Sequence, residues 1–244
     1  MAISLLSEPN PKPLDPYPRL LAFIKALRKT ALALIFSFIG ATLLFYFLSP
    51  RLFNILQGHL HQKLVFFSVT EPFLAHIKLA LGTAILVLMP AFTTCLWRAL
   101  AIPFKLSWRS QVLFIVFTCL LFYAGALFCY AITLAYGIDF LLGFSSEQLQ
   151  PLISIDQFVT FIAVFILGFG LIFELPIFMI FTAKVGLLSR KVFEKNRRYA
   201  VLVISIVAAV LTPTPDVFNM MLMGVPLYGL YEIGIIVLKM MQIS

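Results

Sequence analysis

Residues 157–183 read QFVTFIAVFILGFGLIFELPIFMIFTA, a run of 27 residues with a single charged side chain, Glu174. A helix needs about 20 mainly apolar residues to cross the hydrocarbon core of a bilayer, so this run is long enough to span it. Lipid must then be part of the solvent around the segment. We therefore predict an integral membrane protein.

The composition of the whole chain indicates the same class. Of its 244 residues, 62% are hydrophobic and 11% are charged, against about 45–50% and about 25% in a typical soluble domain. A soluble domain of this size could not bury so many large apolar side chains, and the remainder would form exposed patches. The composition excludes a soluble enzyme and favours one compact membrane domain.

The apolar runs predict an all-α fold with six transmembrane helices in a single membrane domain, residues 25–239. A proline-rich tail, residues 1–24, precedes the domain, and its prolines are expected to prevent a regular helix. Residues 240–244 end the chain. The predicted spans cover residues 27–48 (ended by Ser49-Pro50), 73–97, 110–136, 157–183, 199–211 and 217–237.

The fifth run is unusually short, with thirteen residues. At about 1.5 Å per residue it reaches about 20 Å, which is less than a hydrocarbon core of about 30 Å. Either the helix extends into Arg197 and Arg198, or the bilayer thins around it. We expect one of the six spans to be an incomplete crossing.

The lysines and arginines predict the orientation of the chain. Fifteen of them lie in the tail, the second–third loop, the fourth–fifth loop and the carboxyl end, against Arg51, Lys63 and Lys78 on the opposite side. Because positive residues concentrate on the cytoplasmic side, both termini are expected in the cytoplasm. The net charge of +8 is then explained by the cytoplasmic lysines and arginines that orient the chain. It does not indicate nucleic-acid binding, and no nucleic acid is expected as a partner.

Glu174 is the most unusual residue, because it lies well inside an apolar run. A carboxylate at mid-membrane costs a few kcal/mol or more, so Glu174 should face other helices or water, or be protonated. We predict a functional site there, with a structural hydrogen bond to a neighbouring helix as the alternative. Pro176 should kink the helix, and Gly168 and Gly170 allow another helix to approach closely.

Other polar positions have plainer interpretations. Glu232 is expected to pair with Lys239, and Asp216 to cap the last helix. The sequence contains no nucleophile–base pair, glycine-rich phosphate loop or metal-ligand motif. No catalytic residue, metal or cofactor is therefore predicted, and any transport must draw its energy from an ion gradient or another protein.

Six short stretches, spread over about residues 27–239, match one known family in order, spacing and topology. They are Pro72-Phe73 with Lys78, Leu121-Phe122-Tyr123-Ala124-Gly125, Gly170–Pro176, Asn196-Arg197-Arg198-Tyr199-Ala200, Leu211–Asp216 and Val225–Glu232. Together they resemble the TatC component of the twin-arginine protein translocase.

The resemblance implies a receptor and scaffold in the cytoplasmic (inner) membrane. Such proteins bind the twin-arginine signal peptides of folded cargo, work with TatA- and TatB-type single-span partners, and use the proton-motive force. The implied fold is a cupped bundle of six helices, the last two short, and self-association is expected. The family's intramembrane glutamate corresponds to Glu174. The residues expected as structural or partner contacts are Pro72, Phe73, Lys78, Phe122, Pro176, Arg198, Pro213, Asp216, Pro226 and Glu232.

The expected signal-peptide site departs from the family pattern. The motif His-Leu-x-Glu-Leu-Arg corresponds to residues 23–28, FIKALR, so Ala26 replaces the glutamate and Arg28 is kept. Alignment on residues 121–123 puts Ser107 at the family's second acidic position. Arginines held by carboxylates gain charge-assisted hydrogen bonds. Here the neighbouring lysines and arginines would repel an arginine pair instead.

Twin-arginine recognition by this chain is therefore hypothesised to be weak or made in another way, with Asp15 or Glu8 of the tail as one source of negative charge. Two alternatives stay open. One is a divergent paralogue that acts as an assembly factor. The other is a proton-coupled small-solute transporter that uses Glu174, although such transporters often have internal repeats and the sequence shows none.

Overall fold

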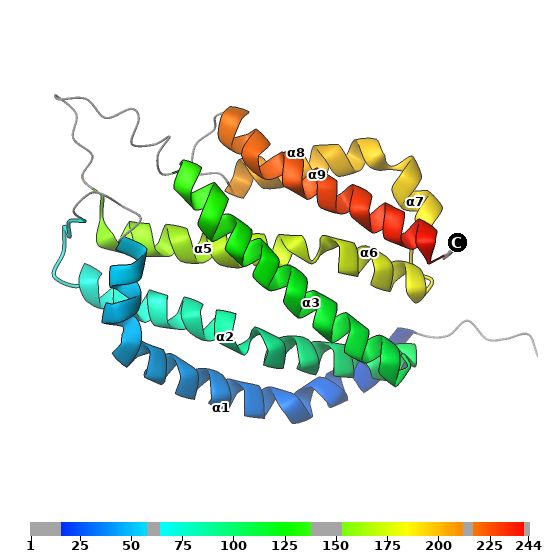
Figure 1. The fold of residues 1–244 in the computed structure, drawn as a ribbon. Coiled ribbons are helices and arrows are strands. Elements are labelled where there is room, and N and C mark those ends of the chain that lie inside the picture. Colours follow the sequence, from blue (N-terminus) through cyan, green and yellow to red (C-terminus); the bar gives the residue numbers. More distant parts are fainter. Residues whose placement is uncertain (1–15, 58–63, 138–152, 212–216, 242–244) are drawn as a thin grey trace, which may run out of the picture.

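The computed structural model describes residues 16–57, 64–137, 153–211 and 217–241. The described chain is almost entirely helical (Figure 1). In chain order the helices are α1 (Pro16–Gln57), α2 (Glu71–Phe104), α3 (Trp108–Phe128), the π-helix η1 (Cys129–Thr133), α5 (Ile155–Phe173), α6 (Leu175–Lys184), α7 (Arg190–Lys195), α8 (Arg197–Leu211) and α9 (Val217–Met240).

Five segments of the described chain are long and apolar enough to cross a membrane. They are Ala31–Gln57, Glu71–Phe104, Trp108–Gly137, Ile155–Lys184 and Met223–Met240. The remaining long element, α8, has 15 residues and reaches only about 22 Å. The predicted all-α fold with a short fifth helix is confirmed, and α8 does extend to Arg197.

The first helix is longer than its predicted span at both ends. It begins at Pro16 and continues through Pro50 to Gln57. The expectations that prolines keep the whole tail non-helical, and that Ser49-Pro50 ends the helix, are therefore wrong. Pro16 lies in the first turn, where a backbone N–H has no intrahelical acceptor to lose. Pro50 removes a donor inside the helix, and Figure 1 shows α1 bent toward its C-terminal end.

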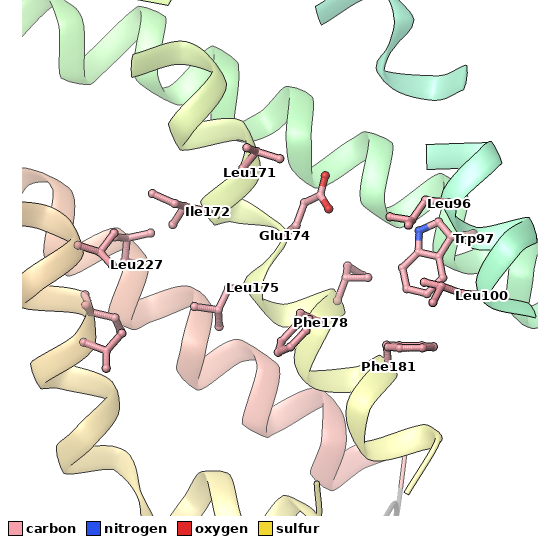
Figure 2. Close-up of a pocket in the computed structure, with 14 residues that line it drawn as sticks. Leu96, Trp97, Leu100, Leu171, Ile172, Glu174, Leu175, Phe178, Phe181 and Leu227 are labelled. Carbon is pink, nitrogen blue, oxygen red and sulfur yellow. The ribbon is translucent and has the colours of Figure 1, made fainter. Parts of the chain in front are cut away.

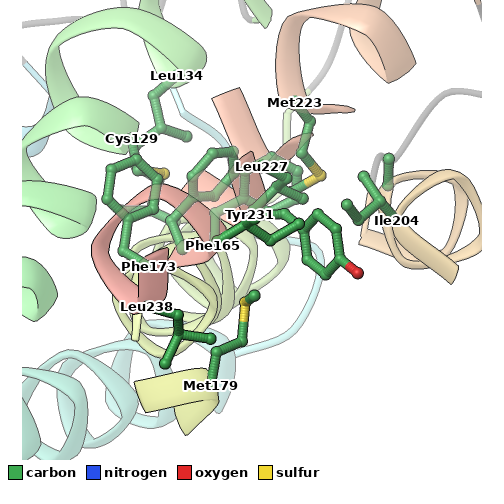
Figure 3. Close-up of a cluster of buried hydrophobic side chains, with 14 of the residues drawn as sticks. Cys129, Leu134, Phe165, Phe173, Met179, Ile204, Met223, Leu227, Tyr231 and Leu238 are labelled. Carbon is green, nitrogen blue, oxygen red and sulfur yellow. The ribbon is translucent and has the colours of Figure 1, made fainter. Parts of the chain in front are cut away.

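The main hydrophobic core is built from residues of the second half of the chain. Its fully buried members come from η1, α5, α6 and α9 and include Phe169. Cys129, Met179 and Leu227 of this group are labelled in Figure 3. Ile204 of α8 packs into the same cluster. α9 packs against α6, and α8 packs mainly against α9. This arrangement brings α8 near the middle of the fourth apolar run.

Two glycines bring α3 and α5 into close contact. A Cβ atom added to Gly125 would lie 2.7 Å from the carbonyl oxygen of Phe169, and one added to Gly170 would lie 2.6 Å from Cε2 of Phe122. Phe122 itself is 1% exposed. The predicted close approach of a helix at Gly170 is confirmed, because only a hydrogen fits between the two helices at these points.

Candidate functional site at the break between α5 and α6

Glu174 occupies an interruption between two helices. α5 ends at Phe173, and α6 begins at Leu175 with Pro176 in its first turn. Proline has no N–H and cannot continue the helical hydrogen-bond ladder. The N–H of Glu174 donates to the carbonyl of Leu171 at 3.2 Å, a tightened turn. The kink predicted from Pro176 is confirmed, and it takes the form of a helix break with Glu174 as the linking residue.

A groove of about 590 Å³ lies beside Glu174, bounded by α2, the α5–α6 break, α8 and α9. In Figure 2 the carboxylate points away from Leu227, toward the half of the view that contains Leu96 and Trp97. The groove is lined almost entirely by apolar side chains. Leu171 and Phe178 at its edge are exposed, so the groove opens outward to the surrounding lipid.

The Glu174 carboxylate lacks a complete set of hydrogen bonds. Its Oε1 atom is buried and has no hydrogen-bond partner among the described residues. The nearest indole, that of Trp97, donates its Nε1–H to Thr118 Oγ1 at 3.0 Å and is therefore not available. The alternative interpretation, a structural hydrogen bond from a neighbouring helix, does not hold for Oε1 within the described chain.

One wall of the groove is an aromatic cluster. Trp97 stacks on Phe114 with ring centroids 4.5 Å apart, and Phe181 meets Trp97 edge-on at 5.2 Å. Such pairs add about 0.5–1.5 kcal/mol each beyond the area they bury. The wall is therefore preformed, and its one side-chain N–H donor, the Trp97 indole, is already bonded to Thr118.

Lys78 links α2 to the start of α5. Its ammonium lies 2.7 Å from Asp156 Oδ2 and 3.0 Å from Thr160 Oγ1. Pro72 lies in the first turn of α2, and Phe73 contacts the ring of Tyr46 edge-on. Lys78 and Phe73 therefore join α2 to neighbouring helices at one end of the bundle. Sequence reasoning did not identify Asp156 as the partner of Lys78.

Glu232 has a different partner from the one predicted. It pairs with Arg197 at 3.0 Å, and Tyr228 donates to its Oε1 at 2.9 Å. Pairing with Lys239 is wrong, because seven positions along a helix exceed the three- or four-residue spacing at which side chains meet. Arg198 is exposed at the start of α8, and Pro226 lies inside α9. The predicted contacts at Pro213 and Asp216 lie outside the described residues.

The expected signal-peptide positions are described in part. Ala26 and Arg28 lie within α1, in the part of that helix whose side chains are not described. Ser107 is the N-cap of α3 and accepts a hydrogen bond from the N–H of Ser110. The two serine hydroxyls lie 2.9 Å apart, and Lys184 Nζ donates to Ser110 Oγ at 2.7 Å. Lys184 comes from the far end of α6, and no signal in the sequence connects it with Ser107.

A metal site does not emerge from this geometry. Within the described ranges, no three His, Cys, Asp or Glu side chains come together as metal ligands would. The chemistry that the Glu174 site offers is therefore that of one carboxylate in an apolar groove.

The family model for TatC, the Sec-independent protein translocase protein, matches residues 22–226. The chain belongs to the TatC family. It is 34% identical over 223 residues to Sec-independent protein translocase protein TatC of Carboxydothermus hydrogenoformans, covering 90% of this chain and 92% of that one. It is 32% identical over 220 residues to the TatC of Helicobacter pylori strain J99, covering 90% and 88%.

The fold agrees with a solved TatC structure. A crystal structure of the twin-arginine translocase receptor TatC in DDM superposes with a TM-score of 0.78 at 27% identity, covering 88% of this chain and 98% of that one. The resemblance to TatC is confirmed, and the chain is a multi-pass membrane protein. TatC is a family of translocase proteins, which agrees with the prediction that the chain is not an enzyme.

Proposed function

We propose that this chain is the receptor and scaffold subunit of a twin-arginine translocase. In that role it exports folded proteins across the cytoplasmic membrane, together with TatA- and TatB-type single-span partners and the proton-motive force. The family match over residues 22–226 and the relatives named as TatC support the proposal. The crystal structure described as a twin-arginine translocase receptor supports the receptor role.

The observation that carries the scaffold role is Oε1 of Glu174, which lies in a groove open to lipid and has no hydrogen-bond partner in the described part of the chain. A polar group within the hydrocarbon region is costly, and a partner helix with a hydrogen-bond donor would remove that cost. A single-span helix suits such a groove, because the groove lies between membrane helices. We assign Glu174 as a contact for a single-span partner.

The proposed orientation places both termini in the cytoplasm, since fifteen of the lysines and arginines lie on that side. The break at Glu174 then lies within the bilayer. The end formed by Ser107, Lys184 and Arg197 faces the cytoplasm, where a cargo signal would arrive.

The test is copurification of the full, tagged chain from its native membrane. We expect small single-span proteins to be recovered with it, and Glu174→Gln and Glu174→Leu to reduce their recovery at least about fivefold, because a contact of about 1 kcal/mol or more is lost. Glu232→Gln is the matched control, since its carboxylate is already paired with Arg197. Equal recovery with all variants would contradict the assignment of Glu174.

An export assay, combined with this copurification, separates the receptor role from the alternative roles. Export of a folded twin-arginine cargo in a strain that lacks its own family member would support the receptor role. Recovery of the single-span partners without export would indicate an assembly factor. A solute transporter is not favoured, because Glu174 is the one charged side chain among the described residues that line the groove.

A further inference from the structure

The turn that leads into α2 presents two neighbouring aromatic side chains to its surroundings. Phe66 is 64% exposed and Phe67 is 68% exposed. The groove at Glu174 is lined by other residues and does not account for these rings. Exposed apolar side chains that lie together mark a surface on which another molecule is expected.

The position of the two rings is set by a backbone bridge to the start of α5. Val65 donates its N–H to the carbonyl of Ile153 at 3.0 Å and accepts a hydrogen bond from the N–H of Ile155 at 2.9 Å. The turn before α2 and the start of α5 lie at the same end of the bundle (Figure 1). Phe66, which follows Val65 directly, is therefore level with the first turn of α5.

The first turn of α5 lies at the level of the lipid headgroups. The apolar segment Ile155–Lys184 has 30 residues and is about 45 Å long, which matches a bilayer of about 40–45 Å with its headgroups. Near the start of the segment, Asp156 pairs with Lys78 at 2.7 Å, and Lys184 marks its other end. Charged side chains at these two levels suit the polar edges of a membrane. The two rings are thus placed beside the headgroups on the face opposite Lys184.

Glu71 braces the turn at this level. Its Oε2 atom accepts hydrogen bonds from the backbone N–H of Phe67 at 3.2 Å and from Ser154 Oγ at 3.0 Å. One carboxylate oxygen thereby holds the turn before α2 against the N-cap residue of α5. Ser154 is 4% exposed, so its side of this contact is shielded from water.

We propose that Phe66 and Phe67 anchor this end of the bundle by inserting into the headgroup–acyl boundary of the adjacent leaflet, and that Glu71 holds them at that depth. Aromatic rings gain from leaving water at that boundary. A second copy of the chain is a poorer occupant, because two phenylalanines bury at most about 500 Å², against about 800 Å² per partner in a stable interface. The inference requires a membrane protein but not the translocase role.

The test measures the depth of the turn in phosphatidylcholine vesicles. The full chain, with its three cysteines replaced by alanine, carries Phe66→Cys, Phe67→Cys or Val69→Cys, each labelled with a polarity-sensitive fluorophore. Val69 is the reference, because it is 90% exposed and α2 begins about 10 Å beyond Lys78. We expect a lipid-attached nitroxide to quench the labels at positions 66 and 67 at least about twofold more than the label at position 69.

Two results would overturn the lipid anchor. One is equal quenching by lipid at all three positions, which would place the rings in water with Val69. The other is shielding at positions 66 and 67 that is lost when the protein is diluted about tenfold in lipid, since dilution separates copies of the chain by mass action. That result would assign the rings to a second copy.

Variants of Glu71 test the brace. Glu71→Ala removes the shared acceptor and should raise the access of iodide to the label at position 67 at least about twofold. Glu71→Gln keeps an acceptor oxygen and should preserve the quenching by lipid. Glu194→Ala, which removes the partner of Arg190 at the opposite end of the bundle, is the control and should change neither measurement. An unchanged label in Glu71→Ala, or an equal change in Glu194→Ala, would refute the brace.

Discussion

Lys78 and Glu174 are both charged side chains within apolar helices, but their surroundings differ. Lys78 has an ion-pair partner and a hydroxyl within hydrogen-bond distance, so its charge is compensated inside the chain. Glu174 Oε1 has no such partner among the described residues. Compensated charges hold the bundle together, whereas an uncompensated one is available to another molecule.

Removal of Lys78 should destabilise the fold. Lys78→Met leaves Asp156 without its counter-ion, and Asp156 Oδ1 already lacks a hydrogen-bond partner in the described chain. We expect a loss of about 1–2 kcal/mol in the free energy of unfolding, measured by thermal unfolding in detergent. The double variant Lys78→Met with Asp156→Asn should recover most of the loss, because the unpaired charge is gone.

Lys239→Met is the matched control, because Lys239 is exposed near the end of α9. It should change the unfolding temperature little. A loss as large as that of Lys78→Met, or a double variant as unstable as the single one, would show that the ion pair does not stabilise the fold.

At the scale of elements, the close contact of α3 with α5 depends on two glycines, because a larger side chain at either position would collide with the other helix. Gly125 faces a backbone carbonyl of α5, and Gly170 faces the buried ring of Phe122. Backbone atoms cannot rotate away as a flexible side chain can. The spacing of these two helices is therefore set by glycine.

Gly125→Ala should separate α3 from α5. The added methyl would lie 2.7 Å from the Phe169 carbonyl, and overpacking of this kind costs about 1–3 kcal/mol. Gly40→Ala in α1 is the matched control, since its methyl would meet nothing within 4 Å and a helical alanine is favoured by about 1 kcal/mol. The unfolding temperature should fall for Gly125→Ala and rise for Gly40→Ala. Shifts of the same sign would contradict this account of the packing.

At the scale of the whole molecule, the charge distribution predicts which end faces the cytoplasm. Val69, in the turn before α2, is 90% exposed, and Leu187, after α6, is 60% exposed. The two sites lie at opposite ends of the predicted spans. They can therefore report on the orientation of the bundle.

In a background whose three cysteines are replaced by alanine, Val69→Cys should react with a membrane-impermeant maleimide in intact cells. Leu187→Cys should react only after the membrane is opened, because the lysine- and arginine-rich loops stay on the cytoplasmic side. The reverse pattern would mean that the orientation is inverted. Labelling of both sites in intact cells would contradict a single topology.

The sequence was sufficient for the class of fold, because apolar length and glycine or proline placement are local properties. Residues 157–183 predicted a membrane span, the thirteen-residue run predicted a short helix, and Pro176 predicted the break at Glu174. The motifs around these positions were enough to indicate the TatC family. The sequence misled at α1, where prolines at the first turn and at a bend are compatible with a continuous helix.

The partners of the charged residues depended on tertiary structure. Asp156 pairs with Lys78, Arg197 rather than Lys239 pairs with Glu232, and Lys184 lies beside the Ser107 position. Each of these contacts joins different helices, and it depends on how far each helix is rotated and shifted against its neighbour. That arrangement results from packing of the whole bundle, such as the glycine contacts of α3 with α5, and short-range sequence patterns do not contain it.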